Sequence, residues 1–385
     1  MDYKRLIKAL VLILIIVGIG VGGYFIWKWV SSSGGIGAIL TGEKTPTTEV
    51  INTTGEGEGE ITTTESETTT QPSQTVTQKL SILINSPVFE YWINSKEKSL
   101  YFANLNGQII RINSDSTRQM MSSQILNGLN EIIPSNDGSF AVAEFNYPQL
   151  TTFSLFSASS TSWQPFATNT ISTTFSPDSQ KIAYLDNTSL KIMDLVTAKI
   201  SETQKMSQVG LNLNWARESE LILSEKASAE TITPIYNFNL NQKKFGNISE
   251  NEYGVVINWS KTDNLGIKLS SSLRKPVLTL VDELGSAVAN LTFITIPEKC
   301  LIESQKIYCG VPKNIRTGMI LPDDYYKKKD YFIDDIFEMD LPTGKVSKIF
   351  DGKDVSIDAH DLKLKDGNLL FINRYDSKLY SLKLD

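Results

Sequence analysis

From residue 80 to the C-terminus, one pattern of apolar and polar positions recurs along the chain. A short apolar strand is followed by a turn rich in Ser, Asp, Asn, Lys and Gly, a second apolar strand, a polar break and an alternating third strand. In the clearest copy, Phe175 ends the first strand, Ser176–Ser179 form the turn and Ile182 lies in the second strand. Period-two alternation between such turns is typical of β-strands, so the pattern predicts an all-β domain.

The pattern repeats with a nearly constant period. Equivalent second-strand positions lie 39 to 44 residues apart, except for a last interval of 62 residues. These positions are Leu100, Phe140, Ile182, Leu221, Leu265, Ile307 and Leu369. Four-stranded units with this period are typical of β-propeller blades. We therefore expect residues 80–385 to form one seven-bladed β-propeller, in which the aromatic residues that end several first strands pack between blades.

The two ends of this domain predict how the ring closes. The last unit stops soon after its third strand, near residues 378–384, and lacks a fourth. Residues 79–84 form an apolar segment that precedes the first complete unit. An open ring would expose unpaired strand edges. We therefore expect residues 79–84 to supply the missing strand by pairing with residues 378–384.

Residues 1–30 differ from the domain in composition. Residues 9–27 are nineteen consecutive uncharged, mostly apolar residues, which is close to the length that crosses a bilayer. Three basic residues precede this run, so the positive-inside tendency places the N-terminus in the cytoplasm and the propeller outside it. A cleaved signal peptide is the alternative, but its apolar region is usually shorter. The prediction is a single-pass transmembrane helix in the plasma membrane, contacting the lipid bilayer through residues 9–27.

Residues 31–79 connect this predicted anchor to the domain. The segment is rich in Thr, Glu and Gly and carries two lysines against seven glutamates. Such a composition buries too little apolar surface to offset the entropy of ordering. We expect a disordered linker that acts as a stalk.

Charge and residue inventory exclude several function classes. The chain carries 37 basic and 43 acidic side chains, the reverse of the basic surplus expected of a nucleic-acid binder. With one histidine, His360, and two cysteines, it cannot assemble a His-rich metal site or a Cys/His zinc cluster. No nucleophile motif surrounds His360. We therefore predict no catalytic residues, no metal and no cofactor.

The two cysteines occupy a predicted hairpin. Cys300 and Cys309 are equidistant from a turn at Ser304 and Gln305, which places them opposite each other on paired strands. Opposed residues of an antiparallel pair come close to disulfide range, and an exported location permits oxidation. The expectation is a Cys300–Cys309 disulfide, although a redox pair is the alternative.

The sixth unit is longer than the others because of an insertion at residues 313–335. It combines aromatic, lysine and aspartate residues, a mixture that is enriched at interfaces. Long loops on rigid scaffolds often carry function, but a loop that only covers a blade edge would also fit. The predicted binding residues are Tyr325, Tyr326, Lys327, Lys328, Lys329, Tyr331 and Phe332.

Two short motifs resemble known propellers. The run from Ser176 to Tyr184, Ser-Pro-Asp-Ser-Gln-Lys-Ile-Ala-Tyr, resembles the WD-repeat-like unit of TolB-type propellers. The cysteine hairpin and the segments Val311–Ile315 and Leu321–Tyr326 are similar to membrane-anchored, uncharacterised envelope propellers of small-genome bacteria. These resemblances imply an interaction platform in the cell envelope and no particular reaction.

Two function classes remain. The first is a non-catalytic binding or scaffold module for an envelope protein, peptide or glycan. The second is a hydrolase or lyase that acts on cell-surface glycan through paired carboxylates in the central funnel. The recognisable first strands, such as Thr174–Phe175 and Leu213–Trp215, are neutral, which favours binding.

Overall fold

The computed structural model describes residues 79–384, apart from residues 147–149, 207–209, 273 and 354. The chain divides into two units, and these residues belong to the second, Thr75–Asp385. The predicted anchor and all but the last residue of the predicted linker lie outside the described residues. Within the described part of the chain, no helix is both long enough and apolar enough to cross a membrane.

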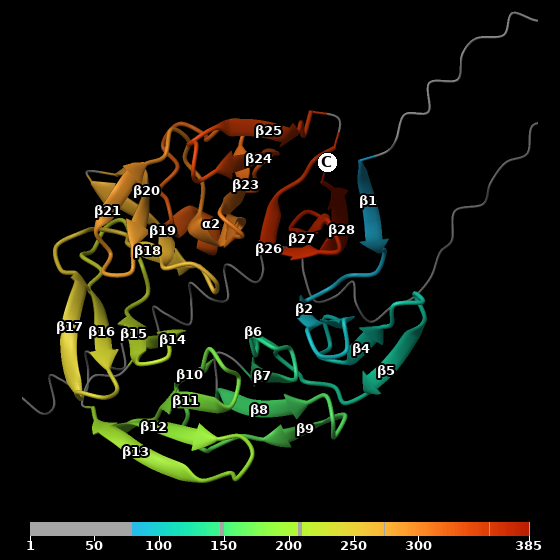
Figure 1. Cartoon of the computed structure of the whole chain (residues 1–385), viewed down its shortest axis with the longest axis vertical. Coiled ribbons are helices and arrows are strands. Elements are labelled where there is room, and N and C mark those ends of the chain that lie inside the picture. Colours follow the sequence, from blue (N-terminus) through green and yellow to red (C-terminus); the bar gives the residue numbers. More distant parts are fainter. Residues whose placement is uncertain (1–78, 147–149, 207–209, 273, 354, 385) are drawn as a thin grey trace, which may run out of the picture. The chain divides into compact units, whose positions relative to one another are not determined.

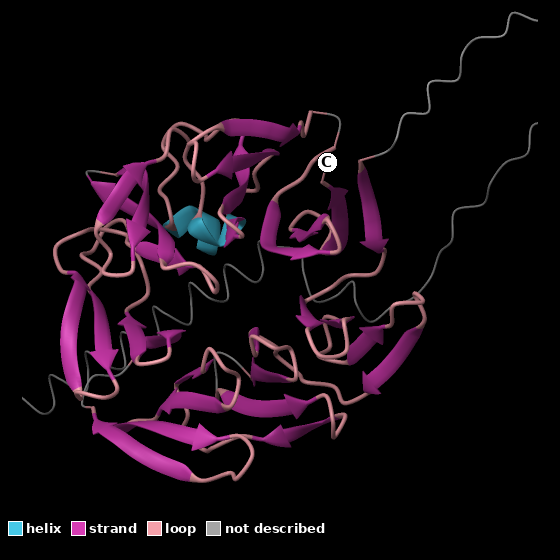
Figure 2. Ribbon diagram, viewed as in Figure 1, coloured by secondary structure: helices cyan, strands magenta, loops and turns pink. Residues whose placement is uncertain are grey.

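The domain is a ring of seven antiparallel four-stranded sheets, as predicted (Figures 1 and 2). Blades one to three are β2 (Glu90–Asn94), β3 (Ser99–Ala103), β4 (Ile109–Ile112) and β5 (Arg118–Ser122); β6 (Glu131–Pro134), β7 (Phe140–Phe145), β8 (Thr152–Ser157) and β9 (Ser162–Pro165); and β10 (Ser172–Phe175), β11 (Lys181–Leu185), β12 (Ser189–Asp194) and β13 (Ile200–Lys205). Blades four and five are β14 (Asn212–Arg217), β15 (Glu220–Ser224), β16 (Ile235–Asn239) and β17 (Lys244–Ser249); and β18 (Val256–Trp259), β19 (Leu265–Ser272), β20 (Lys275–Asp282) and β21 (Ala287–Asn290).

Blades six and seven complete the ring. Blade six is β22 (Cys300–Glu303), β23 (Lys306–Pro312), β24 (Asp334–Asp340) and β25 (Val346–Phe350), preceded by the 3-10 turn η1 (Pro297–Lys299). Blade seven is β26 (Ala359–Lys365), β27 (Asn368–Asn373), β28 (Lys378–Lys383) and β1 (Leu80–Ile84). The short helix α2 (Asp323–Tyr326) lies in the connection between β23 and β24. First strands face the centre of the ring and fourth strands form its rim (Figure 1).

The ring closes as the sequence predicts. Strand β1 pairs antiparallel with β28, with Leu80 opposite Leu382 and Ile82 opposite Tyr380. Leu80 and Ile84 are buried, and they anchor the strand against the rest of blade seven and against blade one. The first and last strands of the domain therefore share one sheet.

The packing between blades uses the aromatic ends of the first strands. Phe175, Trp215 and Trp259 are all buried. Trp215 of blade four shares a core cluster with Ala183 and Leu190 of blade three. These aromatic residues therefore contribute to the core between neighbouring blades, as expected from their recurrence.

The cysteine pairing is confirmed. Cys300 on β22 lies opposite Cys309 on β23, and the two form a disulfide with a Cα–Cα distance of 4.2 Å. Both cysteines are buried in a cluster that includes Ile267 and Leu278 of blade five. The bond thus joins the first two strands of blade six within the core that this blade shares with blade five.

Candidate functional site

A cavity of about 440 Å³ lies on the axis of the ring. Its walls come from six of the seven blades, which places it at the centre. The polar and aromatic lining includes Trp92, Asn136, Lys261, Glu303, Asp361 and Lys363. Most of these residues belong to first strands or to the turns that follow them. Ligand sites of propellers and other closed β-folds lie in such hollows, so we regard this cavity as the candidate site.

Three charged side chains form a cluster at one wall of the channel. The Lys363 ammonium lies 3.3 Å from Glu90 Oε1 and also contacts Asp361 Oδ2. The same ammonium lies 4.1 Å from the centre of the Tyr91 ring. Glu90 and Tyr91 come from blade one, whereas Asp361 and Lys363 come from blade seven. The cluster therefore joins the first and last blades in the ring.

A β-bulge positions Asp361. The register between β26 and β27 shifts between His360 and Lys363, which leaves one extra residue on β26. Asp361 itself has a φ of 52°, a left-handed conformation that aspartate tolerates better than most residues. The Tyr91 hydroxyl donates to the Asp361 carbonyl oxygen at 2.6 Å and supports this geometry. Bulges of this kind re-aim side chains and are common near functional sites.

The two carboxyl groups of the cluster hold their protons differently. Burial raises the pKa of Glu90 well above its usual value, and the neighbouring charge of Asp361 adds to the effect. Burial also acts on Asp361, but the Lys363 ammonium and a hydrogen bond from Glu90 outweigh it and lower the Asp361 pKa. Of the two carboxyl groups, Glu90 therefore holds a proton more readily and donates it to Asp361.

Lys261 offers the cavity a different kind of group. It lies in the turn after β18, is open to the channel water, and forms no ion pair or hydrogen bond through its ammonium with any described residue. Burial by the surrounding blades lowers the pKa of Lys261, and the nearby charge of Lys363 lowers it further. An unpaired ammonium in a partly enclosed cavity is suited to binding an anionic group.

The channel also contains carboxylates that the sequence did not reveal. The first strands identified from sequence were neutral, but the structure places Glu90, Glu131, Glu303 and Asp361 on first strands. The Glu131 side chain is exposed at the surface, but desolvation by the surrounding protein raises its pKa to about 7. The charges of Glu144 and Glu298 add to this shift. The first strands of the ring are therefore not uniformly neutral, contrary to the expectation from sequence. Glu131 lies one residue before Ile132 and Ile133, the apolar pair by which its strand was recognised. Strands β2 and β26 lack a strong alternation of apolar and polar residues, so their carboxylates were not recognised.

His360 is poorly suited to catalysis at neutral pH. Burial lowers its pKa to about 4, so the imidazole is neutral and only weakly basic. Within the described residues, no three His, Cys, Asp or Glu side chains are grouped so that they could hold a metal ion.

The structure divides the predicted contact residues of the insertion into two groups. Tyr325 and Phe332 are buried and stack with ring centres 5.8 Å apart. Tyr326 is half-buried, and its hydroxyl donates to Glu298 at 2.8 Å. The exposed group comprises Lys327, Lys328, Lys329 and Tyr331. Two of the seven predicted contacts are thus core residues in this structure.

The insertion also packs onto other blades. Asp323 accepts hydrogen bonds from Ser228 Oγ and from the Ala229 amide at 2.9 and 2.7 Å. The Ser271 hydroxyl donates to the Leu321 carbonyl oxygen at 2.8 Å. The segment from blade six therefore reaches across blade five to a loop of blade four. This packing fixes the exposed lysines on a rigid base.

Comparisons with known proteins show the fold. No family model and no curated protein matches the chain. Among solved structures, the chain is similar to an oligogalacturonate lyase in complex with manganese, with 10% identity, a TM-score of 0.56, and coverage of 80% of this chain and 93% of that one. A catalytically inactive virginiamycin B lyase from Staphylococcus aureus with quinupristin matches with 10% identity, a TM-score of 0.51, and coverage of 80% and 99%.

The tricorn protease matches with 10% identity and a TM-score of 0.51 over 78% of this chain. The match covers 33% of the tricorn protease, so this chain spans about a third of the length of that protein. TolB and WD40 propellers also occur among the matching structures, with lower similarity. At such identities the likeness establishes a β-propeller and nothing about chemistry.

Proposed function

We propose that this protein is a membrane-anchored, extracytoplasmic binding module that captures a carboxylate-bearing ligand in its central channel. The observation that carries the proposal is the Lys261 ammonium, which faces the cavity without an ion-pair partner among the described residues. The ligand is a segment of an envelope protein, a peptide or a glycan, because each of these can present a carboxylate.

The geometry of the carboxyl cluster favours binding over glycoside hydrolysis. Glu90 and Asp361 share a hydrogen bond and contact the same ammonium. Retaining glycosidases separate their two carboxyl groups by about 5–5.5 Å, and inverting enzymes by about 6.5–9.5 Å. Two carboxyl groups that are hydrogen-bonded to each other leave no room for a sugar carbon or a water molecule between them.

The alternative is a hydrolase or lyase that acts on cell-surface glycan. It remains a second candidate because two carboxyl groups from different blades, Asp361 and Glu303, both line the cavity. A lyase would convert oligogalacturonate into an unsaturated product that is detected by its ultraviolet absorbance. Loss of that absorbance in an Asp361→Asn variant would establish the catalytic function.

The location rests on the sequence of residues 1–30. The uncharged run at 9–27 and the basic residues before it support an uncleaved anchor with the propeller outside the cytoplasm. Protease added to spheroplasts should release the propeller by cutting within residues 41–79. Full protection of the chain in intact spheroplasts would contradict this topology.

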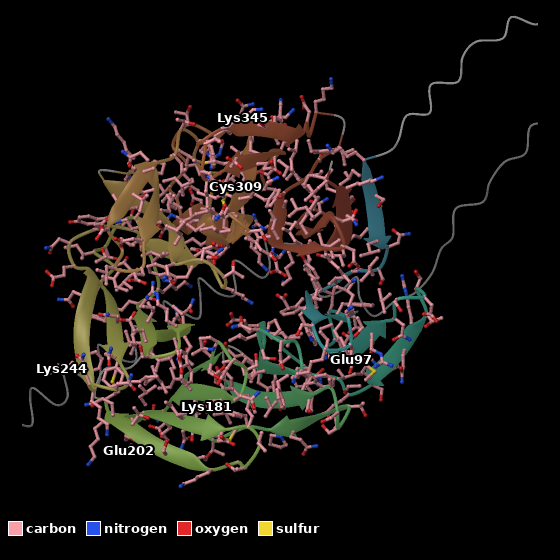
Figure 3. The ribbon with its side chains drawn as sticks, in the orientation of Figure 1. Glu97, Lys181, Glu202, Lys244, Cys309 and Lys345 are labelled. Carbon is pink, nitrogen blue, oxygen red and sulfur yellow. A yellow bond between two sulfur atoms is a disulfide. The ribbon has the colours of Figure 1, made fainter. Side chains whose placement is uncertain are left out.

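Binding to the channel is tested with two carboxylate probes and the full chain in detergent. One probe is a short peptide with a free C-terminal carboxylate, compared with its amidated form, and the other is hexagalacturonate. Lys261→Glu should weaken binding of the recognised probe about tenfold or more in calorimetry, because it replaces attraction by repulsion. Lys244→Glu is the matched control, since Lys244 lies on the rim of the ring (Figure 3). Equal affinity of the two variants for both probes would refute the channel site.

A further inference from the structure

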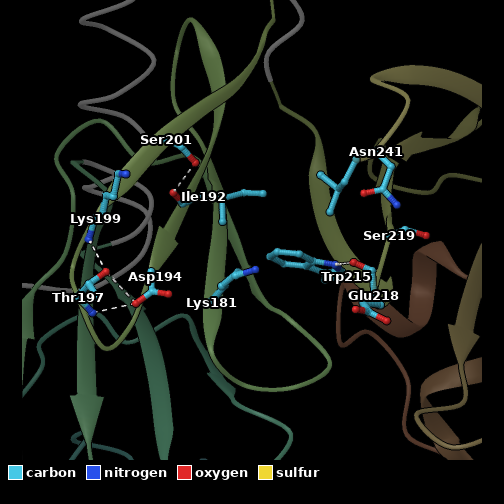
Figure 4. A pocket seen from close by; sticks show the side chains of 11 residues that line it. Lys181, Ile192, Asp194, Thr197, Lys199, Ser201, Trp215, Glu218, Ser219 and Asn241 are labelled. Carbon is cyan, nitrogen blue, oxygen red and sulfur yellow. Dashed lines mark hydrogen bonds between the residues drawn. The ribbon is translucent and has the colours of Figure 1, made fainter.

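The charged groups in the hollow between blades three and four remain in contact with water. This hollow measures about 650 Å³, and two cations, Lys181 and Lys199, share its lining with two anions, Asp194 and Glu218 (Figure 4). Water screens charges of this kind, so opposite charges interact only weakly and stay ionised. The charged cluster between blades six and seven is different, because it has no exposed surface.

Three charged side chains meet at the junction of blades six and seven. Lys299 ends η1 directly before β22, Asp334 begins β24, and Asp358 lies directly before β26. All three side chains are 0% exposed. Lys299 Nζ lies 2.7 Å from Asp334 Oδ2 and also contacts Asp358 Oδ1. One amine nitrogen is therefore enclosed with two carboxyl groups.

Two aromatic rings complete the enclosure. The Lys299 ammonium lies 4.7 Å from the centre of the Phe332 ring and 5.7 Å from the centre of the Tyr325 ring. Both rings are buried and stack on each other. An apolar enclosure disfavours separated charges, so it promotes transfer of a proton from an ammonium to a neighbouring carboxylate. The amine that remains has a free lone pair and is a nucleophile.

Asp334 is suited to accept and pass on that proton. Burial raises the pKa of Asp334 to about 6. Its Oδ2 contacts the Lys299 ammonium and accepts a hydrogen bond from the Ala359 amide, whereas its buried Oδ1 has no hydrogen-bond partner among the described residues. Such unpaired buried atoms are rare in folded proteins. A carboxyl group that exchanges protons with its neighbours accounts for one here.

Asp358 is suited to be the group that the amine attacks. Its Oδ2 accepts hydrogen bonds from the Arg374 guanidinium at 2.8 Å and from the Phe332 amide at 3.0 Å. Two donors on one oxygen stabilise the negative charge that develops there when a nucleophile adds to the carboxyl carbon. The Arg374 guanidinium is itself held against the Tyr325 ring, 4.0 Å from its centre. The other oxygen, Oδ1, faces Lys299 and is free to leave.

We propose that Lys299 and Asp358 react to form an intramolecular amide cross-link between blades six and seven, with Asp334 as the proton relay. Asp334 passes one proton from the Lys299 ammonium to Asp358 Oδ1, which leaves a neutral amine facing a protonated carboxyl group. Nζ then attacks Cγ of Asp358, and negative charge develops on Oδ2 beside its two donors. A second proton, relayed from the nitrogen, lets Oδ1 leave as water.

The reaction balances without any further reactant. Of the three protons on the ammonium, two leave in the water molecule and one remains on the amide nitrogen. The ion pair in the structure is the reactant state. The product joins the two blades next to the Cys300–Cys309 disulfide, but an amide withstands reduction, so this bond depends on neither an oxidising compartment nor a ligand in the channel.

Peptide mass spectrometry tests the bond in the wild-type protein. The full chain, purified in detergent, is unfolded, reduced, alkylated and digested with trypsin, which does not cleave after an acylated lysine. The cross-link should therefore join residues 275–306 to residues 354–363 in one species, one water molecule lighter than the two peptides together. Recovery of residues 275–299 and 354–363 only as separate peptides would overturn the proposal. A link to residues 330–345 would place the bond on Asp334 and overturn the assigned roles.

One variant and one control test the relay. Asp334→Asn keeps the size of the side chain and leaves Lys299 and Asp358 in place, but an amide does not relay protons, so the linked species should be lost. Lys244→Glu, on the exposed rim, should show the same linked fraction as wild type. Melting temperature checks that both variants fold. Linked peptide at the wild-type fraction in Asp334→Asn would overturn the relay.

Discussion

Replacing Lys299 is predicted to be among the most destabilising single changes in the domain. Lys299 ends the 3-10 turn η1 directly before β22, and its side chain is completely buried, as are those of Asp334 and Asp358. Its ammonium lies 2.7 Å from Asp334 Oδ2 and also contacts Asp358. Arg374 gives Asp358 a second cation at 2.8 Å, whereas Asp334 has no other cation among the described ion pairs.

The magnitude follows from what Lys299→Met leaves behind. Asp334 Oδ1 already lacks a hydrogen-bond partner, so the variant would leave the buried Asp334 carboxyl group without a cation and with the Ala359 amide as its remaining donor. Breaking a buried pair by removing one partner costs about 3–5 kcal/mol, because the remaining charge is uncompensated. The loss of the contact with the Phe332 ring, 4.7 Å from the ammonium, adds to this cost.

The assay is urea unfolding, with the free energy obtained by linear extrapolation. Lys306→Met is the matched control: Lys306 lies in the same blade, pairs with Glu338 at 3.1 Å and is 40% exposed, so its removal should cost about 0–1 kcal/mol. Adding Asp334→Asn to Lys299→Met should recover part of the stability, because no buried charge then lacks a partner. A cost for Lys299→Met within 1 kcal/mol of the control would refute the reasoning.

Three further predictions concern pH, the disulfide and the ring closure. Burial raises the pKa of Asp334 to about 6, so the folded protein binds this proton more tightly than the unfolded chain does. The resulting stabilisation is complete below the pKa of Asp334 in the unfolded chain and is lost as pH rises through about 6. The melting temperature of wild type should therefore increase relative to that of Asp334→Asn as pH falls from about 7 to about 4, and a pH-independent difference would contradict the assignment. Replacing Cys300 and Cys309 by Ala should cost about 2–3 kcal/mol in urea unfolding from loss of loop closure, with non-reduced peptide mass spectrometry as the check that the bond forms in native protein. Removing residues 1–70 should leave a folded ring, whereas removing residues 1–88 should lower the urea midpoint markedly because β28 loses its partner; equal midpoints would show that β1 is dispensable.

The fold was predictable because each blade is formed by one copy of a repeated local sequence pattern. Each blade restates the same strand and turn pattern, and the closing strand follows from the missing fourth strand of the last unit. The disulfide was predictable for the same reason, since Cys300 and Cys309 are symmetric about one turn. All of these features depend on residues that are near in sequence or on a period that sequence displays.

The channel cluster was missed because its parts are distant in sequence and lack a shared pattern. Glu90 and Lys363 are 273 positions apart and meet only when the ring closes. The bulge at Asp361 has no glycine or proline to mark it. The insertion shows the converse problem, because Tyr325 and Phe332 look like exposed contacts until Lys299 and Arg374 are seen to pack against their rings.

The position of the channel cluster decides which of its cations is available to a ligand. Glu90 and Lys363 join blades one and seven, at the same seam where the Val88 amide donates to the Ser377 carbonyl oxygen at 2.7 Å. The Lys363 ammonium is already shared by two carboxyl groups there, so a ligand carboxylate would have to compete with both. Lys261 extends from blade five and has no such partner among the described residues. A substitution at Lys363 would therefore change closure and binding together, whereas one at Lys261 changes the charge offered to the ligand alone, which is why the test of the channel site rests on Lys261.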